Sequence, residues 1–134
     1  MKPTWHALFG SAIVALILNF GLLAAPLAQA NPRPLVDAAW LQQALAAGDV
    51  LVLDAQPVKL HDAGHIPGAH NRPFPLNLAG DGTFKHPSFL RAEFTALLDG
   101  ASHETVVHSC GSGVSACHNI LAMELAGLPG TRLY

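Results

Sequence analysis

The sequence predicts an α/β fold in which a mainly parallel sheet is flanked by helices. Residues 50–53 are Val-Leu-Val-Leu, and residues 105–108 are Thr-Val-Val-His; neither run contains Asp, Glu, Lys or Arg. An unbroken apolar run such as the first is typical of a strand that a parallel sheet buries on both faces, and the second is expected to be another buried strand. A segment with apolar residues at helical spacing precedes each run, and another follows the second run. Because helices and strands alternate, we expect parallel strands joined by helical crossovers.

The first helix is expected over residues 38–47. Asp37 can cap its N-terminus, and Gly48 can end it. Its predicted apolar face consists of Trp40, Leu41, Ala44 and Leu45. Residues 55–87 are rich in Pro, Gly, Asn and His, so we expect little regular structure there beyond a short strand near Ala69.

Two further helices and a last strand complete the predicted order. Ser88 can cap the second helix, and Gly100 ends it. Its predicted apolar face consists of Phe89, Leu90, Phe94, Leu97 and Leu98. The third helix is expected over residues 114–126 and is closed by Gly127. Its predicted inward face consists of Val114, Cys117, Ile120, Leu121 and Leu125. Residues 131–134 begin another strand.

The N-terminal 30 residues have the pattern of an export signal. Between Lys2 and Arg33 the chain has no Lys, Arg, Asp or Glu, and residues 7–25 are mostly apolar. A proline at position 26 breaks any helix, and the small-x-small tripeptide at 28–30 is typical of a signal peptidase site. We expect residues 1–30 to be a signal peptide and the mature domain, residues 35–134, to work in a bacterial periplasm. An uncleaved membrane anchor through residues 7–25 is the alternative.

The charge balance of the remaining chain excludes several classes of protein. Beyond residue 30 there are six Lys or Arg and nine Asp or Glu, without a basic run. Nucleic-acid binding, which depends on Lys and Arg contacts with phosphates, is therefore not expected. Two cysteines are too few for a disulfide scaffold, and the high apolar content excludes intrinsic disorder.

Cys110 is the candidate catalytic residue. It follows the predicted strand at residues 105–108, at the end of a parallel sheet where ligands bind. The next residues are Gly111, Ser112 and Gly113, and a helix is expected from Val114. A glycine-containing loop before a helix can turn its backbone N–H groups toward a thiolate and stabilise it. A buried structural cysteine beside a tight turn is the alternative.

The other cysteine and the histidines have simpler interpretations. Cys117 lies two helical turns after Cys110, and we expect it to pack as a small apolar residue. His61 and His65 have a spacing that binds zinc on a helix, and His70 follows. Because Gly64, Pro67 and Gly68 disfavour a helix there, we expect no metal site and no cofactor. Pro67-Gly68 is expected to form a turn, with His65 holding the loop by a hydrogen bond.

Three motifs in this chain resemble the rhodanese family of sulfurtransferases. They are Asp54-Ala55 after a predicted strand, Gly64-His65-Ile66-Pro67-Gly68-Ala69, and Cys110-Gly111-Ser112-Gly113-Val114-Ser115-Ala116. The resemblance runs from about residue 35 to residue 134 and implies a rhodanese-like fold. It also implies that Cys110 carries a persulfide and that a substrate-binding cradle surrounds it, formed by Gly111, Ser112, Gly113, Val114 and Ser115. The loop is most similar to the 3-mercaptopyruvate type, in which the serine matched by Ser112 is thought to assist at the substrate sulfur.

The chain departs from the family pattern at three places. Gln56 stands where the family commonly has an arginine, and Leu60-His61 replaces an acidic–aromatic pair. The family also continues past a strand like residues 131–134 with a further segment and a final helix. We therefore expect a domain truncated at its C-terminus, with Leu128 and Leu133 left exposed. The same resemblance allows a second rhodanese-like domain in the intact protein.

The predicted function is sulfur transfer through a persulfide on Cys110. The donor would be a small anion, thiosulfate or 3-mercaptopyruvate, and the acceptor a thiol or cyanide. Asp54 and His65 are expected to support the site, and Arg72 is a candidate for attracting the donor, with a plain surface charge as its alternative. A degenerate, non-catalytic binding module or truncated remnant is the alternative function. Phosphatase and arsenate reductase chemistry is excluded, because there is no arginine between Cys110 and Gly130 to close the loop.

Overall fold

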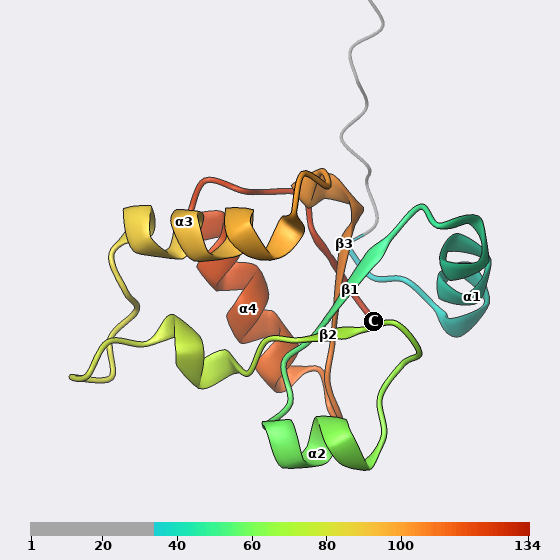
Figure 1. Ribbon diagram of the computed structural model, residues 1–134, viewed down its shortest axis with the longest axis horizontal. Helices are drawn as coiled ribbons and strands as arrows, with labels where there is room; N and C mark the ends of the chain where they lie inside the picture. Colours follow the sequence, from blue (N-terminus) through green and yellow to red (C-terminus); the bar gives the residue numbers. More distant parts are fainter. Residues whose placement is uncertain (1–33) are drawn as a thin grey trace, which may run out of the picture.

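The computed structural model describes residues 34–134, so the predicted signal peptide lies outside the described residues. Figure 1 shows the fold. In chain order, the elements are α1 (Ala38–Ala47), β1 (Leu51–Asp54), α2 (Val58–Ala63), β2 (His70–Asn71), the 3-10 helix η2 (Phe74–Asn77), α3 (Pro87–Leu98), the 3-10 helix η3 (His103–Thr105), β3 (Val106–Ser109), α4 (Val114–Leu125) and β4 (Arg132–Leu133). No helix in this part of the chain is long and apolar enough to cross a membrane.

The four strands form one parallel sheet in the order β2-β1-β3-β4. The central pair, β1 and β3, is in register from Leu51 opposite Val106 to Asp54 opposite Ser109. The predicted α/β class with a parallel sheet is therefore confirmed. Because the strands are parallel, Asp54 and Cys110 leave the sheet at the same edge, the edge that parallel sheets use for ligands.

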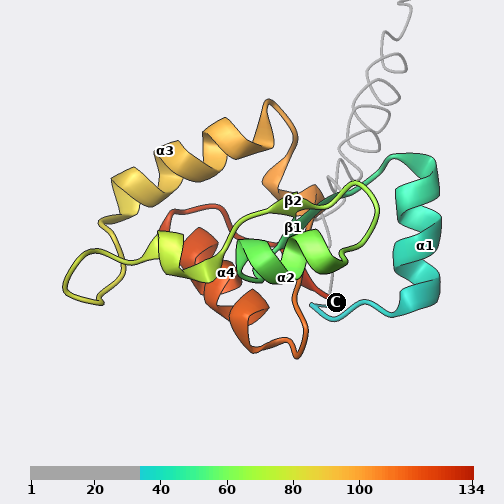
Figure 2. The same cartoon turned by 60° about the horizontal axis from the view of Figure 1, so that its bottom comes forward.

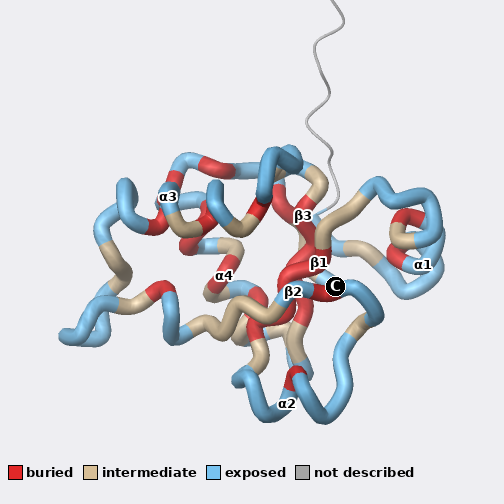
Figure 3. The backbone as a smooth tube through the Cα atoms, in the orientation of Figure 1, coloured by how far each residue is buried: buried red, intermediate tan, exposed pale blue. Residues whose placement is uncertain are grey.

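Helices cover both faces of this sheet (Figure 2). Successive residues of a strand point to opposite faces, so β1 contributes to two separate cores. Leu53 packs with Leu90, Phe94 and Met123 of α3 and α4, whereas Val52 packs with Leu41 of α1 on the other face. Figure 3 shows that the buried positions concentrate in β1 and β3. The site is thus anchored to the most buried strands of the molecule.

Helix α1 begins and ends where the sequence predicts. The Asp37 carboxylate accepts a hydrogen bond from the backbone N–H of Trp40 at 2.8 Å, and Gly48 ends the helix in the left-handed conformation with φ 76°. Leu41 and Ala44 are buried as expected. Trp40, also predicted on the apolar face, is exposed instead, and the Arg132 guanidinium lies 5.0 Å from the centroid of its ring.

Helix α2 was not predicted. Pro57 precedes it and Gly64 follows it. The residues that disfavour a helix, Gly64, Pro67 and Gly68, all lie beyond its C-terminal end, so they do not interrupt it. His61 lies within α2, and His65 lies just beyond its end. The turn at Pro67-Gly68 and the short strand β2 after Ala69 are confirmed.

Helix α3 begins slightly earlier than predicted. Its N-cap is His86, whose imidazole accepts a hydrogen bond from the backbone N–H of Ser88, so Ser88 is not the cap. Leu90, Phe94 and Leu98 are buried, but Phe89 is 65% exposed. Except for Phe89, the apolar spacing of this helix therefore predicted its inner face correctly.

The inward face predicted for α4 is wrong. Its buried residues are Ala116, Asn119, Ala122 and Met123. Val114, Leu121 and Leu125 are exposed, and so is Cys117. A buried asparagine explains the difference: Asn119 makes hydrogen bonds inside the molecule, as described below, and its small neighbours let α4 approach the sheet closely. A prediction that considers only apolar residues therefore turns the wrong face of such a helix toward the sheet.

The exposure expected at the C-terminal end is also wrong in part. Leu128 is only 5% exposed and belongs to the core formed by α3 and α4. Leu133 is half-buried, and its backbone N–H bonds to the Pro34 carbonyl at 2.7 Å. The segment that follows α4 thus packs well against the described domain.

Candidate functional site

The Cys110 loop links the end of β3 to the start of α4. Gly113 is the N-cap of α4 and has φ 83°, a left-handed conformation that favours glycine. That conformation turns the chain sharply, so that the first N–H groups of the helix face back toward Cys110. These N–H groups have no partner within the helix and are available to bind an anion.

The Cys110 sulfur lies among backbone donors. The Gly113 N–H donates a hydrogen bond to Sγ at 2.9 Å. Partial burial raises the pKa of the Cys110 thiol, but the backbone N–H groups of Ser112, Ala116, Gly113 and Ser115 together outweigh this effect, so its pKa lies below the ordinary value. A thiol in such surroundings is a stronger candidate for a nucleophile than a buried structural cysteine.

The predicted cradle residues contribute through their backbones. Ser112 and Gly111 are exposed, and Val114 is 75% exposed at the start of α4. Gly111 passes close to the opposite wall, since a Cβ added there would lie 3.6 Å from the Gln56 Oε1 atom. The structure therefore brings all five loop residues together around Cys110, as the sequence predicts. Their assignment to substrate binding stays a prediction.

A cavity of about 410 Å³ opens above Cys110. A cavity of this size can hold a small organic or inorganic ion. Its lining residues come from the carboxyl ends of β1, β3 and β4 and from the segment after α2, and they are Asp54, Gln56, Gly64, His65, Ile66, Ser109, Cys110 and Tyr134. Figure 1 shows β1 and β3 ending beside α2, at this edge of the sheet.

Asp54 organises one wall of the cavity. Its carboxylate is buried and accepts hydrogen bonds from the backbone N–H of Gln56 at 3.1 Å and from the Gln56 side-chain amide at 3.3 Å. The His61 Nδ1 atom lies 2.8 Å from the same carboxylate. Asp54 thus lies at the site, where the sequence predicts a supporting residue. Its side chain contacts Gln56 and His61.

His65 lies on the same wall. Its Nδ1 atom is 2.8 Å from the His61 backbone carbonyl, which is the loop-holding hydrogen bond that the sequence predicts. Its ring stacks on the His61 ring with centroids 3.7 Å apart. Among the residues that the structure describes, no three His, Cys, Asp or Glu side chains gather into a metal-binding group.

Arg72 does not line the cavity. Its guanidinium bonds to the Glu93 carboxylate at 2.7 Å and to the Asn77 side-chain oxygen at 3.1 Å, and it lies 4.9 Å from the centroid of the Phe94 ring. With only 11% of the side chain exposed, the surface-charge alternative is wrong. The expected role in attracting the donor finds no support in this geometry.

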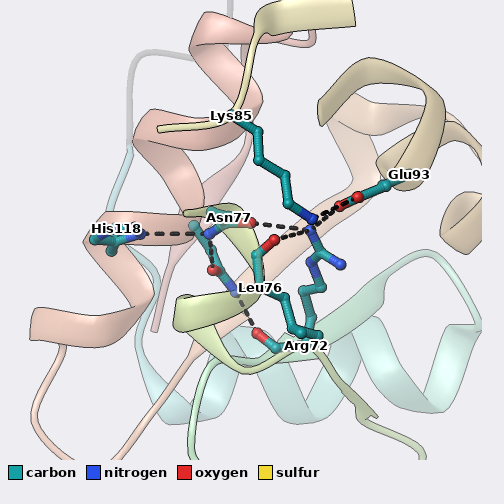
Figure 4. Close-up of polar contacts among 7 residues, drawn as sticks. Arg72, Leu76, Asn77, Lys85, Glu93 and His118 are labelled. Atoms are coloured by element: carbon teal, nitrogen blue, oxygen red, sulfur yellow. Dashed lines mark hydrogen bonds and ion pairs between the residues drawn. The ribbon is translucent and has the colours of Figure 1, made fainter. Parts of the chain in front are cut away.

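A buried polar network surrounds Arg72 instead (Figure 4). The Asn77 amide donates to Asn119 Oδ1 at 2.7 Å, and the Asn119 amide donates to the Arg72 carbonyl at 2.8 Å. The Arg72 N–H in turn donates to the Asp54 carbonyl at 2.8 Å. Arg72 therefore serves the site through its backbone, because this network ties α4 to the end of β1.

Five residues that line the cavity were not among the predicted site residues: Gln56, Gly64, Ile66, Ser109 and Tyr134. Gln56 was noted only as a departure from a family pattern, although its position two residues beyond the strand end predicts that it reaches the site. Tyr134 follows β4, and parallel pairing of β4 with β3 brings it to the same edge as Cys110. A strand order for the sheet, which the sequence does not supply, is needed to place Tyr134.

Comparison with known proteins assigns the family. Residues 37–134 match the family model of the rhodanese-like domain. The chain therefore belongs to the rhodanese-like domain family, as the motifs predicted.

The most informative relatives are sulfurtransferases. The chain is 48% identical over 115 residues to a protein of Pseudomonas aeruginosa named "Probable 3-mercaptopyruvate sulfurtransferase", with 79% of this chain and 40% of the relative covered. The solved structure of SseA, a 3-mercaptopyruvate sulfotransferase of Escherichia coli, superposes with a TM-score of 0.64 at 32% identity, covering 78% of this chain and 42% of that one. The human single-domain sulfurtransferase TSTD1 gives a TM-score of 0.56 at 27% identity, covering 75% of this chain and 88% of that one. This chain thus spans about two-fifths of the length of the first two relatives.

Proposed function

We propose that this chain is a sulfurtransferase of the rhodanese and 3-mercaptopyruvate type, with Cys110 as the sulfur carrier. The single observation that carries the proposal is the Cys110 thiol itself, which lies under an open cavity and is surrounded by backbone N–H groups. The names of the relatives support the same class of reaction. A cysteine with a lowered pKa in a cavity is poised for nucleophilic attack.

The first half of the reaction loads Cys110 with sulfur. The thiolate attacks the outer sulfur of thiosulfate, and the S–S bond of the donor breaks to release sulfite. With 3-mercaptopyruvate the carbon–sulfur bond breaks, and the carbon fragment takes the electron pair. The N–H groups of Ser112, Gly113, Ser115 and Ala116 then stabilise negative charge on the persulfide, as they stabilise the thiolate.

The second half passes the sulfur to an acceptor. A thiol or cyanide attacks the outer sulfur, and the bond between that sulfur and Cys110 Sγ breaks, so that Cys110 returns to a thiolate. Neither Lys nor Arg is among the cavity-lining residues of the described chain. The attraction for an anionic donor therefore comes from the backbone N–H groups and the N-terminus of α4, a helix of 12 residues.

Export and domain partnership complete the proposal. We place the protein in a periplasm because of the signal-like residues 1–30. N-terminal sequencing of the chain from a cell-envelope fraction should give Asn31 as the first residue, whereas Met1 would contradict cleavage. The Pseudomonas aeruginosa relative and the Escherichia coli SseA are more than twice as long as the region they match, and the proposal includes a second rhodanese-like domain beside this one in the intact protein.

The activity test compares two cysteine variants. Cys110→Ser should abolish formation of thiocyanate from cyanide with either donor, whereas Cys117→Ser should retain most of it, because Cys117 lies on the exposed face of α4. Circular dichroism checks that both variants fold. Equal loss in the two folded variants would contradict the role of Cys110. Absence of activity in the wild-type chain with both donors would favour the non-catalytic binding module.

A further inference from the structure

Two stacked histidines form part of the cavity wall. His61 is buried in α2, and His65 lies one helical turn later, beyond the end of that helix. Their rings are nearly parallel, with an interplanar angle of 12° and centroids 3.7 Å apart. His65 lines the cavity together with Cys110, whereas His61 does not. The pair therefore extends from the buried interior, at His61, to the cavity above Cys110, at His65.

The hydrogen bonds of the pair define the protonated nitrogen on each ring. An ionised carboxylate can only accept hydrogen bonds, so the His61 Nδ1–H donates to Asp54 at 2.8 Å. A backbone carbonyl can also only accept, so the His65 Nδ1–H donates to the His61 carbonyl at 2.8 Å. When the His65 ring is neutral, its lone pair is consequently on Nε2.

Asp54 holds the first residue of this chain of contacts, His61, in a fixed position. Its side chain is buried, and its backbone carbonyl accepts hydrogen bonds from the Asn71 amide at 3.1 Å and from the Arg72 N–H at 2.8 Å. The position of the His61 ring is thus fixed by β1, and the His65 ring is fixed by His61 through both the stack and the carbonyl. Three linked contacts determine where the His65 ring lies in the cavity.

We propose that His61 is a positioning residue for sulfur transfer to thiols: it holds His65 so that Nε2 of His65 can take the proton of the attacking acceptor. The proposal rests on the proposed sulfurtransferase function and concerns its second half. The acceptor thiol gives its proton to Nε2 of His65 as its sulfur bonds to the outer sulfur of the persulfide. The bond between Cys110 Sγ and that sulfur breaks, and the electron pair stays on Cys110. The products are the acceptor persulfide, the Cys110 thiolate and a protonated His65.

Two variants separate the two contacts of His61. His61→Phe keeps a flat ring against His65 but removes the Nδ1–H donor to Asp54. His61→Asn keeps a donor at nearly the same place but removes the ring. His103→Phe is a matched control, because it removes a similar hydrogen bond, from Nδ1 to the Pro129 carbonyl at 2.7 Å, outside the cavity-lining set.

The experiment measures the two halves of the reaction separately in the full chain. Cys110 is first loaded with thiosulfate or 3-mercaptopyruvate, and its mass gain is recorded. The loaded protein is then mixed with dithiothreitol, which must lose a proton, or with sulfite at mildly alkaline pH, which attacks as an anion. The His61→Phe variant should load normally and react normally with sulfite. Its maximal rate with dithiothreitol should fall about 10- to 100-fold, with partial recovery in His61→Asn and none of this loss in His103→Phe.

Each outcome decides a different part of the proposal. If the wild-type chain takes up no sulfur, the proposed function itself fails. If it loads, and His61→Phe transfers to dithiothreitol at the wild-type rate or loses sulfite transfer equally, the positioning role is wrong. Nitrogen-15 NMR of the wild-type protein gives a check that does not depend on the variants folding: a neutral His65 should carry its proton on Nδ1. A proton on Nε2 instead would overturn the proposal.

Discussion

At the scale of single residues, the lowered pKa of Cys110 follows from where the backbone places its donors. None of the groups that lower the pKa of this thiol is a charged side chain. The effect therefore depends on the conformation of residues 112–116 and persists in any sequence that keeps this turn. A loop made of glycine, serine and valine can therefore lower the pKa of a cysteine without a basic side chain.

Alkylation measures this property directly. In the Cys117→Ser variant, the rate of reaction of Cys110 with iodoacetamide should rise with pH through a midpoint below that of a free thiol. The same protein in denaturant should show the ordinary midpoint, since the loop no longer exists. A native midpoint at or above the denatured one would show that burial, which raises the pKa, outweighs the backbone donors.

Sequence reasoning at the scale of residues placed groups correctly where chain geometry alone decides their position. It placed Cys110 at the carboxyl end of β3, residues 111–115 in the turn that follows, and the two ends of α1. It failed for Arg72, because a cation in a polar loop usually faces solvent and only the tertiary fold supplies Glu93 and Asn77 as partners. It considered His61 as a possible metal ligand and as a departure from the family pattern, but did not pair it with Asp54, because α2, which brings the two side chains together, was not expected.

At the scale of elements, the junction of β3 and α4 determines the site. Gly113 adopts φ 83°, and a Cβ added there would meet no neighbouring atom within 4 Å, so a side chain would cause backbone strain and no collision. Gly82, in the loop before α3, has the same φ and the same open surroundings. The two glycines allow the effect of the turn on catalysis to be separated from its effect on stability.

Alanine at these two positions should have equal effects on stability and different effects on activity. Both Gly113→Ala and Gly82→Ala should lower the free energy of unfolding by about 1–2 kcal/mol, the cost of a left-handed conformation, as measured by urea denaturation. Only Gly113→Ala should also lower sulfur transfer, because its N–H bonds to the Cys110 sulfur. Similar activity in the two variants would show that the turn at Gly113 is not needed for catalysis.

The elements themselves were largely predictable, and the exceptions have physical causes. Strands β1 and β3 and helices α1, α3 and α4 appear close to the expected residues. Helix α2 was missed because it has only six residues between Pro57 and Gly64. The inner face of α4 was misplaced because Asn119, a polar residue, is the one that points inward to Arg72 and Asn77.

At the scale of the whole molecule, one buried group makes stability depend on pH. His108 in β3 is completely buried, and neither of its ring nitrogens has a hydrogen-bond partner in the described structure. Burial lowers the pKa of His108 to about 4. Since the unfolded chain binds this proton near the ordinary histidine value of about 6.5, acid favours the unfolded state between these two values.

The free energy of unfolding should therefore fall as the pH decreases from about 6.5 toward 4, by up to about 1.4 kcal/mol per pH unit. Urea denaturation at several pH values measures the slope. Replacing His108 with Leu should reduce the slope in this window. His118, whose pKa burial also lowers, should account for part of the remaining slope, and the carboxylates act mainly at lower pH. Glu93 is one of them: burial raises its pKa, but Lys85 and Arg72 lower it more. An unchanged slope in His108→Leu would assign the effect to other groups.

The central claim is that Cys110 carries the sulfur, and the most direct test is the intact mass of the protein after exposure to a donor. The full chain is incubated separately with thiosulfate and with 3-mercaptopyruvate and then freed of small molecules. The wild type and Cys117→Ser should each gain the mass of one sulfur atom with at least one donor, and the gain should disappear on treatment with cyanide. Cys110→Ser should gain nothing. A wild-type chain that stays at its original mass with both donors, or a folded Cys110→Ser variant that still gains one sulfur, would contradict this account.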